Sequence, residues 1–131
     1  MKPIIRNMIL GIFILGIGIA FAQKPDWKHL GMRTVALSAD RDVIGVGAKE
    51  GLFKAIKLTV RKSGIHFMDM KVHFRNGDVI DVEIRNLIPA GGETRVIDLP
   101  GANRYIDKVV FWYKSTERNP QKAVVKLWGL K

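Results

Sequence analysis

The chain has 131 residues and no cysteine, and 22 basic residues outnumber 12 acidic ones, which gives a formal net charge of +10 at pH 7. The missing cysteine excludes disulfides, a lipoprotein anchor and thiolate chemistry. The basic residues are spread along the chain rather than gathered in one run, which favours general solubility over a dedicated polyanion site and predicts no specific nucleic-acid site.

Residues 1–22 have the pattern of a secretory signal peptide. Lys2 and Arg6 precede the uncharged stretch MILGIFILGIGIAFA, whose last three residues form an Ala-x-Ala site. An uncleaved anchor is the alternative, although the apolar segment only just approaches the roughly 20 residues of a spanning helix. We therefore expect cleavage after Ala22, an exported protein of residues 23–131, periplasmic or extracellular, and no membrane span after cleavage.

The remaining sequence alternates apolar and polar residues between breaks that contain Gly, Pro and Asn, without a sustained helical period. This pattern predicts strands at 28–39, 43–47, 53–61, 65–74, 78–85, 93–99, 105–114 and 122–129. In the third of these, Ile56, Leu58 and Val60 are expected to face the core. Eight short strands predict an all-β, single-domain sandwich of jelly-roll type.

The clearest element is a hairpin in IHFMDMKVHFRNGDVIDVEIR. A two-residue turn would set its apolar face against acidic residues. A three-residue loop at 75–77, with Gly77 in a left-handed conformation, instead pairs Val72 with Ile80 and Met70 with Val82. The apolar pattern favours this second register. It also places Lys71 opposite Asp81 on the outer face.

One histidine and two methionines in the first strand of this hairpin suggest a metal site. His66, Met68 and Met70 are spaced by two, so a regular strand would place an imidazole and two thioethers on one face. Such soft ligands suit Cu(I), and a periplasmic copper-handling protein is the alternative function. Packing of the methionines in the core is the competing interpretation.

The stretch RYIDKVVFWYKS at 104–115 has apolar residues on both faces of a strand. Val109, Phe111 and Tyr113 are expected in the core. Val110 and Trp112 are then expected under the N-terminal segment around Trp27 or at a partner surface. Exposed aromatic residues can stack on sugar rings, and the candidate ligand-binding residues are Trp27, Trp112 and Tyr105.

Evidence for catalysis is weak. His66 and His73 lie seven residues apart in one strand, so they are expected on opposite faces. No serine occupies a G-x-S-x-G elbow, and the glycines at 45–51 lack the context of a phosphate loop. The sequence therefore predicts no catalytic residue and no cofactor, and an envelope hydrolase is the third hypothesis.

A resemblance to a known family is carried by the stretches WKHLG, FKAIKLTVRKSGIHFMDMKVHFRNGD, IPAGGETRVIDLPGANRYIDKVVFWYKS and AVVKLWG. Through them the chain resembles a group of small exported bacterial proteins known only as a domain of unknown function. The stretch IDLPGANRYIDKVVFWY is also similar to strands of galactose-binding-like jelly rolls. The first resemblance implies a β-sandwich, and neither implies a ligand.

These observations favour a non-catalytic envelope protein or binding module. Without Lys2 and Arg6, 20 basic residues face 12 acidic ones, a net charge of +8. Such an excess attracts anionic surfaces. The expected partner is an anionic or glycan component of the envelope.

Overall fold

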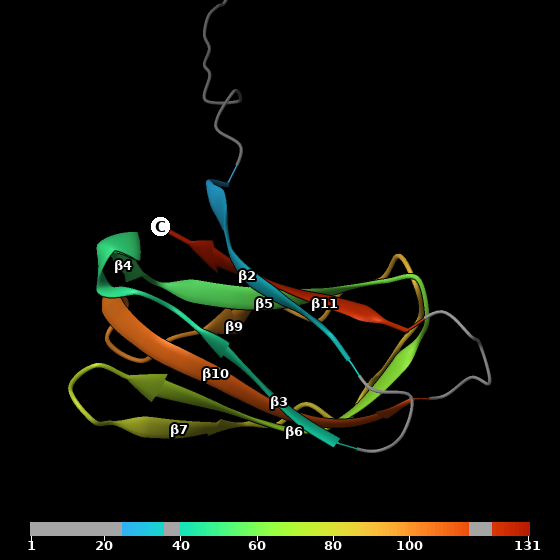
Figure 1. Ribbon diagram of the computed structural model, residues 1–131. Helices are drawn as coiled ribbons and strands as arrows, with labels where there is room; N and C mark the ends of the chain where they lie inside the picture. Colours follow the sequence, from blue (N-terminus) through green and yellow to red (C-terminus); the bar gives the residue numbers. More distant parts are fainter. Residues whose placement is uncertain (1–24, 36–39, 116–121) are drawn as a thin grey trace, which may run out of the picture.

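The computed structural model describes residues 25–35, 40–115 and 122–131, and the predicted signal peptide lies outside this part of the chain. Two antiparallel sheets face each other across one core (Figure 1). This arrangement confirms the predicted all-β sandwich. Within the described ranges, no helix has the length and the apolar character that crossing a membrane would require.

The larger sheet has the strand order β3, β10, β6, β7, with two short additional strands. Its members are β3 (Asp40–Gly45), β10 (Arg104–Ser115), β6 (Ile65–Phe74) and β7 (Val79–Val82), with β4 (Leu52–Phe53) on β10 and β8 (Leu87–Ile88) on β6. The smaller sheet consists of β2 (Trp27–Thr34), β11 (Val124–Leu130), β5 (Ala55–Arg61) and β9 (Ile97–Asp98), in that order. A 3-10 turn, η2 (Ala48–Glu50), precedes β4.

The strand order is that of a jelly roll. When the two-residue strands β4 and β8 are set aside, the smaller sheet holds the first, eighth, third and sixth main strands in chain order. The larger sheet holds the second, seventh, fourth and fifth. Two interleaved Greek keys produce this alternation, so the predicted jelly-roll type is confirmed. Residues 36–39 of the first predicted strand lie outside the described residues, and the strand predicted at 93–99 is shortened to β9.

The core is formed by the inward faces of both sheets. Val109, Phe111 and Tyr113 of β10 are buried in it, as the alternation in the sequence predicted. Phe111 packs against Phe67 of β6 in a T-shaped geometry, with ring centroids 5.8 Å apart. Full burial of a Val, Leu or Phe side chain contributes roughly 1.5–3 kcal/mol. This apolar core is what stabilises a chain that has no cysteine for a disulfide.

The β6–β7 hairpin has the predicted register. Met70 pairs with Val82, and Val72 pairs with Ile80. A slip by one residue would move the whole apolar set of β7 to the solvent side, which is why the apolar pattern was sufficient to select the register.

The hairpin loop and its outer ion pair also follow the prediction. The backbone N–H of Phe74 donates to the carbonyl of Asp78 at 2.8 Å, and Gly77 has a φ angle of 95°. On the outer face, the Lys71 ammonium donates a hydrogen bond to Asp81, and this bond raises the pKa of Lys71. The local sequence therefore specifies both the turn and the pairing.

A β-bulge at Met68–Asp69 interrupts the alternation of β6. Successive residues of β10 pair with Asp69 and then with Phe67, so Met68 is left without a partner in this ladder. The extra residue on the outer face allows both Phe67 and Met70, three positions apart, to point into the core.

Candidate binding face on the four-stranded sheet

The outer face of the smaller sheet gathers aromatic and basic side chains from three strands. In β5 and β11, buried residues alternate with exposed or half-buried ones, so the latter lie on the face away from the core. The pairing of β2 with β11 places Met32 beside Lys126 and His29 beside Trp128 on the same face. We call this surface the Trp128 face; it consists of Trp27, His29, Met32, Lys57, Thr59, Arg61, Lys126 and Trp128.

Trp128 is at the centre of this face, and two contacts fix its ring. Its indole N–H donates a hydrogen bond to Thr59 Oγ1 at 2.9 Å. The imidazole of His29 packs against it, with ring centroids 5.0 Å apart and an interplanar angle of 66°. The indole is half-buried, so part of its surface stays open to solvent beside these partners.

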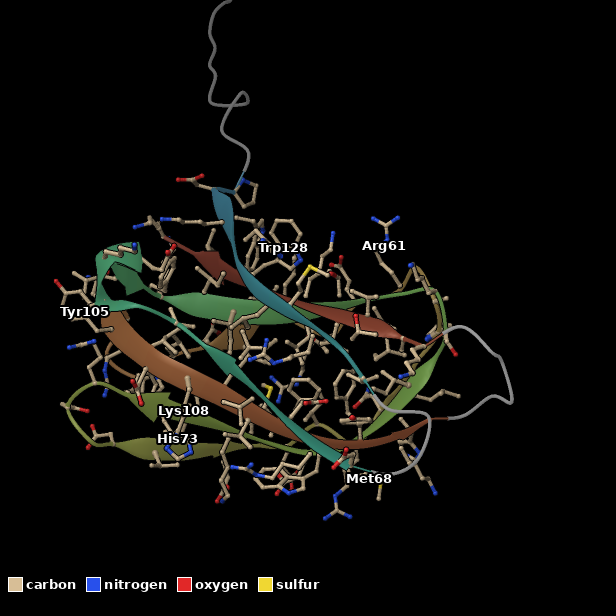
Figure 2. The ribbon with its side chains drawn as sticks, viewed as in Figure 1. Arg61, Met68, His73, Tyr105, Lys108 and Trp128 are labelled. Atoms are coloured by element: carbon tan, nitrogen blue, oxygen red, sulfur yellow. The ribbon has the colours of Figure 1, made fainter. Side chains whose placement is uncertain are left out.

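A hollow of about 400 Å³ lies beside the indole. Its lining residues are Thr59, Val60, Arg61, Gly91, Gly92, Glu93, Lys126 and Trp128. Figure 2 shows Arg61 and Trp128 projecting from the smaller sheet on the side away from the larger one. The hollow therefore opens on the outside of the sandwich, next to a fixed aromatic ring.

One rim of the hollow is backbone rather than side chain. The segment that contains Gly91 and Gly92 runs along the edge of β5, where Gly91 N–H donates to the carbonyl of Val60 at 2.8 Å and Val60 N–H donates to the carbonyl of Gly92 at 2.9 Å. A Cβ atom at Gly92 would lie only 3.1 Å from the carbonyl oxygen of Pro89. Glycine permits this close approach, and it leaves the rim without side chains.

The charges around the hollow are not balanced. Lys57 forms an ion pair with Glu93 at 3.3 Å, and its ammonium lies 4.5 Å from the ring centroid of Trp27. Arg61 and Lys126 form no ion pair with any residue in the described part of the chain. The acidic residue of the hollow is thus already neutralised, and two positive charges remain.

The side chains of this face offer two kinds of noncovalent contact. A fixed indole offers an apolar surface for stacking, and a guanidinium and an ammonium offer charge-assisted hydrogen bonds to an anion. Across the described residues, no group of three or more His, Cys, Asp or Glu side chains is arranged to hold a metal ion. The face thus presents a half-buried indole beside two basic side chains that have no ion-pair partner among the described residues.

The three aromatic residues predicted as a ligand site do not come together. Trp27 lies on the Trp128 face. Trp112 lies on the outer face of the larger sheet, where the Arg41 guanidinium carbon is 5.7 Å from its ring centroid. Tyr105, at the start of β10, is 47% exposed and pairs with Leu52 of β4. Trp27 and Trp112 therefore belong to opposite outer surfaces of the sandwich.

Of the two covers predicted for Trp112, the N-terminal segment is wrong, and the partner surface stays a prediction. The segment around Trp27 pairs with β11 as a strand of the other sheet and does not lie across β10. Trp112 is half-buried and has the Arg41 guanidinium above its ring, and Val110 on the same face is only 1% exposed. The sequence suggested a loose segment because of the charges and the proline around Trp27, but strand pairing determines its position.

The shared face predicted for the three copper-ligand candidates is wrong, because β6 contains a bulge. The bulge places Met68 outside, 41% exposed, and Met70 inside, 0% exposed, so His66, Met68 and Met70 do not share a face. The same bulge brings His66 and His73 to the same outer face, which corrects the prediction of opposite faces. A bulge changes the parity of the alternation, and no residue type in this stretch signals it.

Sequence reasoning missed Trp128, which the structure places at the centre of the face. Its outward position was available from the pattern AVVKLWG, since Val125 and Leu127 face the core. The contacts of Trp128 with His29 and Thr59 could not be predicted from this pattern, because they depend on which strands flank β11.

Comparison with known proteins gives a family and no activity. A family model described as a domain of unknown function (DUF2541) matches residues 8–129. The chain belongs to this family. The predicted membership of such a group is thereby confirmed. No curated protein matches the sequence. A solved structure, the SPBc2 prophage-derived protein YomS, is similar with a TM-score of 0.48 and 17% identity, over 88% of this chain and 100% of that one.

Proposed function

We propose that this protein is an exported, non-catalytic module that binds a glycan of the cell envelope on the Trp128 face. The observation that carries the proposal is the indole of Trp128, held in one orientation by Thr59 beside an open hollow of about 400 Å³. A fixed aromatic ring stacks on the apolar face of a sugar without losing much side-chain entropy.

The surroundings of Trp128 support the same function. The backbone rim at Gly91 and Gly92 lets a ligand approach closely, and a sugar offers hydroxyl groups to the polar side chains around the ring. The net charge of +8 expected for residues 23–131 would bring the protein to anionic envelope polymers before the specific contact forms.

The test is glycan binding by the purified protein at high salt, where screening weakens nonspecific charge attraction. We expect Trp128→Ala to abolish binding and Trp128→Phe, which keeps a ring but loses the hydrogen bond to Thr59, to retain part of it. Trp112→Ala is the matched control, because it removes the same side chain from the opposite outer surface. Equal binding by Trp128→Ala and the unchanged protein would contradict the proposal.

Export has its own test. Mass spectrometry of the protein recovered from its native host should find Gln23 at the N-terminus. An intact Met1 would contradict export to the envelope. The glycan-binding part of the proposal would then be tested by the Trp128 variants alone.

A further inference from the structure

We infer that the glycan carries an acidic group, a carboxylate, phosphate or sulfate, which Arg61 and Lys126 hold together beside the ring stacked on Trp128. This inference rests on the proposed function, and it adds the chemical class of the ligand. The positions and charges of side chains on the Trp128 face point to this site.

The two cations are diagonal neighbours on adjacent strands. In the pairing of β5 with β11, Arg61 lies opposite Val124, and Lys126 lies opposite Thr59. Residues related in this way on one face have Cβ atoms less than roughly 8 Å apart, within reach of long side chains. Both residues line the hollow, so one anion placed between them can contact the guanidinium and the ammonium at once.

Charge balance distinguishes these two residues from the third cation of the face. Lys57 is already occupied, because it pairs with Glu93 and lies over Trp27. Arg61 and Lys126 have no such counter-charge among the described residues, and they repel each other. A bound anion would remove this repulsion. An uncharged sugar would leave it in place.

The position of the anion site relative to Trp128 defines the ligand further. Lys126 and Trp128 are two residues apart in β11 and point to the same side of the sheet. An acidic group held by Lys126 and Arg61 is therefore carried by the stacked sugar itself or by the next unit of its chain. Uronic acids and phosphate- or sulfate-substituted sugars fit this requirement.

The experiment compares an oligouronide with its methyl ester, which keeps the sugar rings and removes the charge. Titration calorimetry of the purified exported protein should give at least about tenfold tighter binding of the acid, the gain expected from charge-assisted hydrogen bonds. Parallel titrations with a neutral oligosaccharide and with its phosphorylated and sulfated forms identify which anion is preferred. A preference of at least about tenfold for any acidic form over its neutral counterpart supports the inference.

Variants assign the preference to the two residues. Arg61→Gln and Lys126→Gln should each reduce the preference for the acidic form about fivefold or more, while binding of the neutral form stays unchanged. Lys108→Gln is the control, since it makes the same charge change on the larger sheet, opposite His73. A preference that survives in the Arg61→Gln, Lys126→Gln double variant overturns the inference.

The remaining outcomes separate the inference from the proposed function. Equal affinity for acidic and neutral forms, lost in Trp128→Ala, overturns the anion site and leaves the glycan site standing. Binding of every form that is unaffected by Trp128→Ala overturns both.

Discussion

Tyr113 donates a hydrogen bond from its hydroxyl to Asp42 Oδ2 at 2.8 Å, joining the core face of β10 to β3. The Tyr113 ring is buried in the core, while its hydroxyl reaches a half-buried carboxylate of the neighbouring edge strand. The bond therefore anchors the edge of the larger sheet to its centre.

Removing this hydroxyl tests that anchor. We expect Tyr113→Phe to lower the free energy of unfolding by about 1–2 kcal/mol, because a hydrogen bond to a charged acceptor is lost and the ring packing is kept. Urea denaturation measures the change. Asp42→Asn, which retains an acceptor oxygen, should cost less, and an unchanged midpoint for Tyr113→Phe would contradict the assignment.

Two glycines give a matched pair for steric packing. A Cβ atom at Gly129 would lie 2.6 Å from Cδ1 of Phe53 and 2.8 Å from Cδ1 of Leu30, whereas one at Gly45 would have no atom within 4 Å. We expect Gly129→Ala to destabilise the fold by about 1–3 kcal/mol or more, as overpacking does. Gly45→Ala should be neutral within about 0.5 kcal/mol. Thermal unfolding measures the stability of the two variants. Equal melting temperatures would argue against the close packing at Gly129.

The bulge in β6 predicts opposite results for two methionines. Met70→Ala should cost about 2–5 kcal/mol, since the side chain is fully buried and leaves a cavity. Met68→Ala should change stability by less than about 0.5 kcal/mol, because Met68 is on the outer face. Chemical denaturation measures both. Equal losses would mean that the two side chains share a face and that no bulge exists.

Removing the hydroxyl group of Ser63 should stabilise the fold. Its hydroxyl is buried, and it has no hydrogen-bond partner in the described part of the structure. We expect Ser63→Ala to raise the free energy of unfolding by up to about 1 kcal/mol, since a buried unpaired hydroxyl carries a desolvation cost that the methyl group avoids. Ser63→Thr, which keeps the hydroxyl and adds volume, is the control. A clear loss of stability in Ser63→Ala would reveal a partner for the hydroxyl.

Alternation and turn chemistry were sufficient to predict the fold. The core face of Val109, Phe111 and Tyr113 and the register of Met70 with Val82 depend on neighbours within a strand or across one short loop. These are local relationships, and the sequence contains them directly. The jelly-roll type was predicted from the number and spacing of strands, and the structure confirms it.

The candidate site was less accessible to sequence reasoning. Its residues come from β2, β5 and β11, and the contacts of Trp128 with His29 and Thr59 exist only because β11 is inserted between the other two strands. The predicted common face of His66, Met68 and Met70 was wrong for a related reason, because one unpaired residue at Met68 reversed the alternation of β6. The contacts of Trp128 and the bulge in β6 both depend on how neighbouring strands pair, which the sequence of a single strand does not reveal.

The position of β11 between β2 and β5 also determines when the domain can form during translation. The other strands that the structure describes are synthesised before Val124, but β2 and β5 have no common neighbour until residues 124–130 have left the ribosome. A nascent chain that stops short of β11 exposes two long unpaired strand edges, which favour aggregation. The smaller sheet, and with it the Trp128 face, therefore assembles only after β11 is made, whereas all four main strands of the larger sheet are available earlier.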